Sequence, residues 1–110
     1  MAVKSLNEGG AVPDAYTRLA DVLGLKGVRG EFVEAFLNFQ GFGATLYYAS
    51  IGQQPAAAAP GVQWPAASIM TLGPRQSPGS GFRLENYWVK NTVGGSAATV
   101  VVQASIEDGQ

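Results

Sequence analysis

Hydrophobic and polar residues alternate along several short stretches of this chain, with a period of two. The clearest stretch covers residues 29–39 (RGEFVEAFLNF). A two-residue period is that of a β-strand, whose successive side chains point to opposite faces. One face would carry Val33, Ala35, Leu37 and Phe39, and the other Phe32, Glu34, Phe36 and Asn38. The pattern therefore predicts a strand whose second face is itself partly apolar.

Alternation, or enrichment in β-branched and aromatic residues, predicts four further strands. They cover residues 44–50, 69–72, 82–93 and 98–106. The Gly-rich segment QGFG separates the first two strands of the chain, so we expect these two to pair as a β-hairpin.

The segment 15–25 (AYTRLADVLGL) allows two interpretations. Leu19, Val22 and Leu23 have helical spacing, and Asp14 could cap a helix. The span is short and meets Gly24, so a strand followed by a turn fits equally well.

Five strands, with a sixth allowed near residues 16–23 and with Gly and Pro in the turns, are typical of an antiparallel β-sandwich or jelly roll. We therefore predict an all-β fold of about six strands. A chain of 110 residues is one domain. Residues 1–13 are small and polar, contain glycine and end at Pro13, so we expect a flexible N-terminal arm followed by a single domain over 14–110.

The 40 residues between Glu34 and Arg75 carry no charge. Gly, Pro, Asn and Gln interrupt this run too often for a transmembrane helix, and the N-terminus lacks the apolar core of a signal peptide. Two interpretations remain: a buried strand pair followed by a neutral loop, or a surface that another protein covers. The neutral loop, residues 51–68, is apolar and contains Trp64, so we expect it to be ordered and extended.

Composition restricts the classes of function and of partner that we expect. Charged residues make up 14% of the chain and the formal net charge is −1, which favours association with other protein surfaces. The basic residues are scattered and matched by acids, so we expect no nucleic-acid partner. Without cysteine or histidine, disulfides, thiolate metal sites and the commonest general base are excluded. We expect no enzyme activity, no catalytic residue, no metal, no cofactor and no small-molecule substrate.

The remaining candidates for chemistry are weak. Glu31 and Glu34 are three residues apart, which on a regular strand places them on opposite faces. GFGATL (41–46) and GPRQSPGSG (73–81) lack the features of nucleotide-binding loops and are better explained as turns.

Aromatic residues are the better candidates for binding. Adjacent strand residues face opposite ways, so one member of Tyr47/Tyr48 and one of Tyr87/Trp88 should point away from the core. Exposed Trp and Tyr often anchor protein interfaces, and they also form stacking platforms for sugars. The predicted interface residues are Trp64, Pro55, Pro60, Val62, Pro65, Tyr48 and Trp88.

The order of three segments, LNFQGFGATLYYAS, ASIMTLGP and RLENYWVKNTVGGSAATVVVQASI, resembles that in small β-sandwich structural proteins of tailed bacteriophages. Within this group the chain is most similar to head decoration (cement) proteins. The resemblance covers nearly the whole chain, as a pattern without a diagnostic motif.

The resemblance implies a protein made in the bacterial host cytoplasm and located on the capsid surface of the virion. Cement proteins of this kind are commonly homotrimers that bind the major capsid protein, staple neighbouring coat subunits and perform no chemistry. The alternatives are a tail or adaptor protein, since the same fold could serve there, and a carbohydrate-binding module that uses the aromatic residues. Membrane association is not expected.

Overall fold

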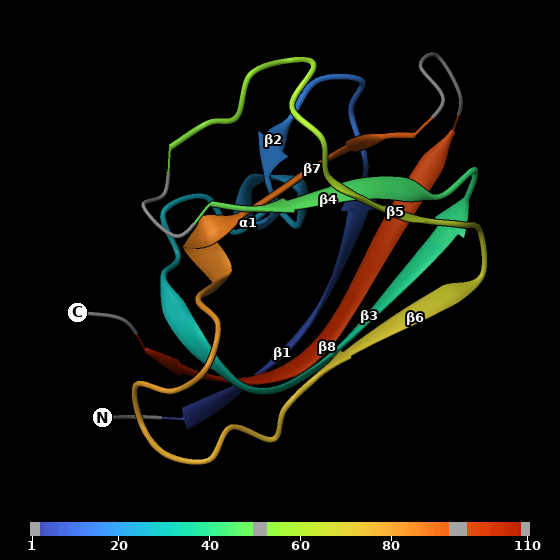
Figure 1. The fold of residues 1–110 in the computed structure, drawn as a ribbon. Coiled ribbons are helices and arrows are strands. Elements are labelled where there is room, and N and C mark those ends of the chain that lie inside the picture. The colour runs from blue at the N-terminus through green and yellow to red at the C-terminus, as the bar shows by residue number, and fades with distance from the viewer. Residues whose placement is uncertain (1–2, 50–52, 93–96, 109–110) are drawn as a thin grey trace.

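The computed structural model describes residues 3–49, 53–92 and 97–108, and it confirms the predicted all-β sandwich. Two antiparallel sheets of four strands face each other, with strand orders β1-β8-β3-β6 and β2-β7-β4-β5. Figure 1 shows the first sheet as a strongly curved layer below the second. The first sheet consists of β1 (Val3–Ala11), β8 (Ala98–Asp108), β3 (Gly30–Gly41) and β6 (Ser68–Leu72). The second consists of β2 (Thr17–Arg18), β7 (Tyr87–Asn91), β4 (Ala44–Tyr48) and β5 (Val62–Trp64).

The hydrophobic core fills the space between the sheets. Its largest fully buried side chains are Phe32, Phe39, Leu19, Leu37, Leu84, Ile106, Val89, Val100 and Val102. They come from both sheets, from the four-residue helix α1 (Leu19–Val22) and from the 3-10 turn η1 (Leu84–Asn86). A single core joins all these elements, as expected for a sandwich of this size.

The N-terminal segment differs from the expectation of a flexible arm. Val3–Ala11 form strand β1, which pairs with β8 along its whole length without a register shift. Leu6 is buried in the core. The segment lacks the β-branched and aromatic enrichment that signals a strand, and its pairing partner β8 supplies the order instead. It is part of the sandwich and not an appendage to it.

The predicted hairpin of β3 and β4 is wrong. β3 pairs with β8 and β6 in one sheet, whereas β4 pairs with β7 and β5 in the other. The chain crosses between the sheets at Gly41 and Gly43, both of which have positive φ angles. A Cβ atom on Gly43 would lie 2.2 Å from the Trp64 carbonyl oxygen, so glycine is required at this crossing.

A β-bulge changes which residues of β3 face the core. The register against β8 shifts between Phe32 and Glu34, so Val33 is the extra residue. Phe32 is therefore buried on the same side as Ala35, whereas strict alternation placed them on opposite faces. Glu31 and Glu34 consequently share the outer face of the sheet, contrary to the prediction from their odd spacing.

Both interpretations of segment 15–25 are partly confirmed. Thr17–Arg18 form β2, which pairs with Val89 and Trp88, and a single helical turn, α1, follows directly. The Leu25 N–H donates to the Ala20 carbonyl at 2.8 Å, and Gly24 has a φ of 74°. The turn ends there because glycine readily adopts this left-handed conformation.

Candidate functional site

The uncharged run of the sequence forms one side of the sandwich. We define the uncharged side as residues 35–49 and 53–74, the described part of that run. It contains β4, β5, β6 and most of β3. β5 and β6 are end strands of the two sheets, and only three residues connect them, so one edge of each sheet lies on this side. Figure 1 shows β5 and β6 together, away from β1 and β2.

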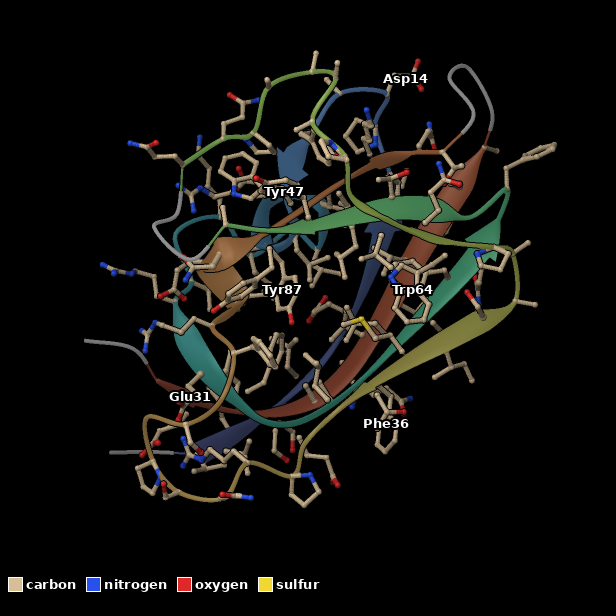
Figure 2. The ribbon with its side chains drawn as sticks, in the orientation of Figure 1. Asp14, Glu31, Phe36, Tyr47, Trp64 and Tyr87 are labelled. Atoms are coloured by element: carbon tan, nitrogen blue, oxygen red, sulfur yellow. The ribbon has the colours of Figure 1, made fainter. Side chains whose placement is uncertain are left out.

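Large apolar side chains are exposed on the uncharged side. Phe36, Phe42, Val62 and Ile69 have relative exposures of 46, 61, 59 and 60%. They make up four of the six exposed large hydrophobic residues in the described ranges. In Figure 2, Phe36 points away from the core, below β3 and β6. An apolar area without charge is suited to burial against another protein surface.

Trp64, the main predicted interface anchor, packs instead against its own chain. Its ring stacks on Phe39 with centroids 5.5 Å apart and an interplanar angle of 12°. The side chain is half-buried against the core between β5 and β3 (Figure 2). Its Nε1 is buried and has no hydrogen-bond partner among the described residues. Trp64 therefore closes the gap between the two sheets at this edge.

The alanine- and proline-rich loop folds onto the outer face of its own second sheet. The Tyr16 hydroxyl donates to the Ala59 carbonyl at 2.9 Å, and Gln54 Nε2 donates to the Tyr16 carbonyl at 3.0 Å. Lys90 Nζ donates to the Ala57 carbonyl at 2.8 Å and lies over the Tyr16 ring. Tyr16 thus contacts the loop at Gln54 and Ala59, and residues 51–52 lie outside the described part.

The other predicted interface residues are divided between the core and the surface. Tyr48 points inward, with its ring 4.8 Å from that of Tyr87, so Tyr47 is the outward member of its pair. Trp88 points outward but is buried beneath the Arg18 guanidinium, 4.6 Å above the ring. Pro60, Pro65 and Val62 are exposed, and Pro55 is half-buried. One ring face of Trp64 is covered by Phe39, and Trp88 is almost wholly covered within its own chain.

Glu31 is the centre of a charged cluster on the outer face of the first sheet. The loop 73–81 covers it: Gly79 N–H donates to Oε1 at 3.0 Å, and Gly81 N–H donates to Oε2 at 2.8 Å. The Arg75 guanidinium pairs with both Glu31 and Glu107. Burial alone would raise the pKa of the Glu31 carboxyl, but these donors outweigh it and the pKa is lowered. A carboxylate saturated in this way fastens the loop to β3 and has little capacity left for proton transfer.

A basic cleft that the sequence did not reveal lies beside α1 and η1. Its volume is about 680 Å³, and its charged lining consists of Arg18, Lys26, Arg29, Arg83, Asp21 and Glu85. Four of the seven basic residues of the chain gather here: Arg18, Lys26 and Arg29 lie close in sequence, and the fold adds Arg83. The basic residues are therefore clustered and not scattered as we expected. The complete cluster cannot be recognised in the sequence, because α1 and η1 become neighbours only in the folded chain.

Glu85 occupies the middle of the basic cleft. It pairs with Arg83 and lies 3.9 Å from Arg29 Nε, and it accepts a hydrogen bond from Gly30 N–H at 3.0 Å. Burial acts to raise the pKa of Glu85, but the Arg83 and backbone donors lower it below its usual value. The cleft has four cationic side chains against two carboxylates, so it favours an acidic group of a partner.

Within the described ranges, no group of three or more Asp or Glu side chains is arranged to hold a metal ion. None of the helices in the described part is long and apolar enough to cross a membrane. No family model, curated protein or solved structure matches this chain.

Proposed function

We propose that this protein is a non-enzymatic structural protein of a bacteriophage virion, and specifically a head decoration protein. It binds the outer surface of the capsid through contacts with the major capsid protein and stabilises the contacts between coat subunits. In this proposal the protein acts as a homotrimer.

The observation that supports the proposal is the uncharged side. This side carries an end strand of each sheet and exposes Val62 and Ile69 within a run of residues that has no charge, so it is costly to leave in water and favourable to cover. A decoration protein needs such a surface, because its work is attachment. Repetition of the contact over a lattice then multiplies a modest affinity through avidity.

Placement on the particle is the first test. Antibody-gold labelling of particles of the phage that encodes the chain should place the protein on the shell. Label on the tail would replace the decoration role by a tail or adaptor role, and label-free particles would contradict a virion role altogether.

A charge on the uncharged side tests the attachment surface. In Val62→Glu/Ile69→Glu, two carboxylates would have to be buried at the interface, so we expect at least about a tenfold loss of affinity for purified shells. The control is Ala15→Glu, which adds a carboxylate at another exposed position, beside β2. Co-sedimentation with shells measures both variants, after circular dichroism has confirmed their folding. Equal binding by the double variant and the control would contradict this use of the uncharged side.

A further inference from the structure

The first strand of the chain forms an open edge of the sandwich on the side opposite β6. β1 is the end strand of its sheet, nine residues long, and contains no proline. α1 approaches it at Gly10, where an added Cβ would lie 1.9 Å from the Val22 carbonyl oxygen. Residues 3–9 lie before that contact, and Figure 1 shows β1 beside β8 at the end of the curved sheet. Long open edges readily pair with another strand unless they are blocked.

The backbone groups that face this open edge follow from the ladder. Val12 N–H donates to the Ala98 carbonyl at 2.9 Å, in the register that pairs Ala11 with Thr99. In an antiparallel ladder the bonding direction alternates. Even-numbered residues of β1 therefore bond toward β8, and odd-numbered residues direct their N–H and C=O groups outward. The outward-directed residues are Val3, Ser5, Asn7, Gly9 and Ala11.

We propose that β1 pairs with β1 of a second copy of this chain, antiparallel, about a two-fold axis at Leu6. This contact joins two four-stranded sheets into one continuous sheet of eight strands, and it does not depend on the proposed virion role.

The charges of β1 are self-complementary in this register. Lys4 and Glu8 are both exposed and lie on the same face of the strand, two residues either side of Leu6. An axis at Leu6 places Lys4 opposite Glu8 of the second copy and Glu8 opposite Lys4 of the second copy. Both are non-hydrogen-bonded pairs, in which cross-strand side chains approach most closely. Lys4 also interacts within its own chain, and its three N–H donors can serve both contacts.

The outer face of the paired strands fits as well. Val3 is exposed and would lie opposite Gly9 of the second copy. Gly9 has no side chain, and Val101 Cγ2 lies 3.2 Å from the position of its missing Cβ. The Val3 side chain can therefore pack on Val101 of the second copy. Ser5 would lie opposite Asn7 of the second copy, a pair of hydrogen-bonding side chains.

No other register places Lys4 opposite Glu8 of the second copy. An axis at Asn7 places Lys4 opposite Gly10, an axis at Ser5 places it opposite Leu6, and an axis at Glu8 brings two carboxylates together. An axis between two residues would oppose outward-bonding and inward-bonding positions, which breaks the ladder. Only the axis at Leu6 satisfies the backbone and both charges.

Charge reversal tests the contact. Lys4→Glu and Glu8→Lys each replace two attractions by two repulsions, so each should lower the association constant about tenfold. The double variant Lys4→Glu/Glu8→Lys restores opposite charges across the axis and should recover wild-type association. Ala15→Glu, which adds a charge at an exposed position outside β1, should leave association unchanged. Sedimentation equilibrium at low salt measures all four against the wild type. The contact is contradicted if the wild type is no larger than the single variants, or if the double variant fails to recover.

A disulfide test fixes the register independently of charge. The chain has no cysteine, so any disulfide that forms must join the introduced cysteines. In the proposed register Ser5 and Asn7 of the two copies form a pair with Cα atoms about 5.5 Å apart, within the range of a disulfide. A mixture of Ser5→Cys and Asn7→Cys chains should cross-link on mild oxidation, and neither variant alone should do so. Cross-linking of Asn7→Cys alone would move the axis to Asn7, and absence of any cross-link would overturn the pairing.

Discussion

Phe32 and Phe36 lie four residues apart on β3, yet their surroundings are opposite. Phe32 is 2% exposed and packs in the core near Tyr87, with ring centroids 6.2 Å apart, whereas Phe36 is 46% exposed on the outer face. The bulge at Val33 separates them, because one extra residue exchanges inward and outward positions from that point on. The same substitution at the two positions therefore has different consequences.

We predict that Phe32→Ala lowers the free energy of unfolding by about 3–5 kcal/mol, since it leaves a cavity in a close-packed core. Phe36→Ala should lower it by less than about 1 kcal/mol, because the side chain is half in water already. Urea unfolding followed by tryptophan fluorescence measures both. Similar losses at the two positions would show that the bulge does not place Phe32 in the core.

At the residue scale, strict alternation correctly placed Ala35, Leu37 and Phe39 on one face of β3, and the structure shows that this face is buried. Strict alternation failed for Phe32. A bulge depends on how two strands pair, so the sequence of one strand does not reveal it. The rule that adjacent aromatic residues face opposite ways is confirmed for Tyr47/Tyr48 and Tyr87/Trp88. Which member faces inward depends on the partner strand, so Tyr48 was chosen for the surface incorrectly.

The loop 73–81 shows how one carboxylate organises an element without regular structure. Glu31 accepts two backbone N–H groups of the loop and contacts Arg75, while Arg75 N–H donates to the Val33 carbonyl at 2.9 Å. These contacts form only with the ionised carboxylate at full strength. The stability of the fold should therefore depend on pH through Glu31.

Because the pKa of Glu31 is lower in the folded protein than in the unfolded chain, the unfolded state binds more protons as the pH falls. The stabilisation is present above the unfolded value of about 4.3 and is lost as the pH falls through the folded value. We predict that the free energy of unfolding decreases below about pH 5, and that Glu31→Gln weakens this decrease and costs about 1–3 kcal/mol near pH 7. Urea midpoints over this pH range measure the effect.

Glu34→Gln is the matched control on the same strand, since its side chain is exposed on the outer face. It should change stability by less than about 0.5 kcal/mol. An equal effect of the two substitutions would mean that the loop contacts contribute nothing specific.

At the element scale, four of the five predicted strands lie close to their predicted positions. In the fifth segment, 82–93, the strand begins only at Tyr87 because η1 takes its first part. The predicted pairing of β3 with β4 was wrong. The Gly-rich segment after β3 reads locally as a hairpin turn, but the hydrogen-bond partners of β3 are β8 and β6, from distant parts of the chain. Local residues determine that a turn occurs, and packing of the whole sandwich determines which sheet receives the next strand.

The distribution of charge over the molecule follows from this topology. The uncharged run reaches one edge of each sheet on one side, whereas α1, η1 and four basic residues meet elsewhere at the basic cleft. The uncharged run could be read directly from the sequence. The cleft could not, because Arg18 and Arg83 are 65 positions apart and only the fold brings α1 and η1 together.

The proposed homotrimer predicts the mass that the purified protein has in solution. Light scattering coupled to size-exclusion chromatography should give a multiple of three chains for the wild type, with Ala15→Glu as a surface control. A mass of two chains would contradict the trimer and leave the edge contact of β1 as the route to association, whereas a mass of one chain would contradict both. Trp64→Ala is unsuited to this measurement, because loss of the stack on Phe39 would destabilise the fold itself.

The strand order β1-β8-β3-β6 also affects how the protein folds during its synthesis. The last strand of the described chain lies between the first and the third, so β1 and β3 have no partner on that flank until β8 is present. On the ribosome, β1 and β3 must therefore wait for residues 98–108 to leave the exit tunnel, and only then can the curved sheet close over the core. A nascent chain that stops before β8 would expose two unpaired strand edges and become a substrate for chaperones or proteases, so the topology itself restricts assembly to chains whose synthesis has passed this point.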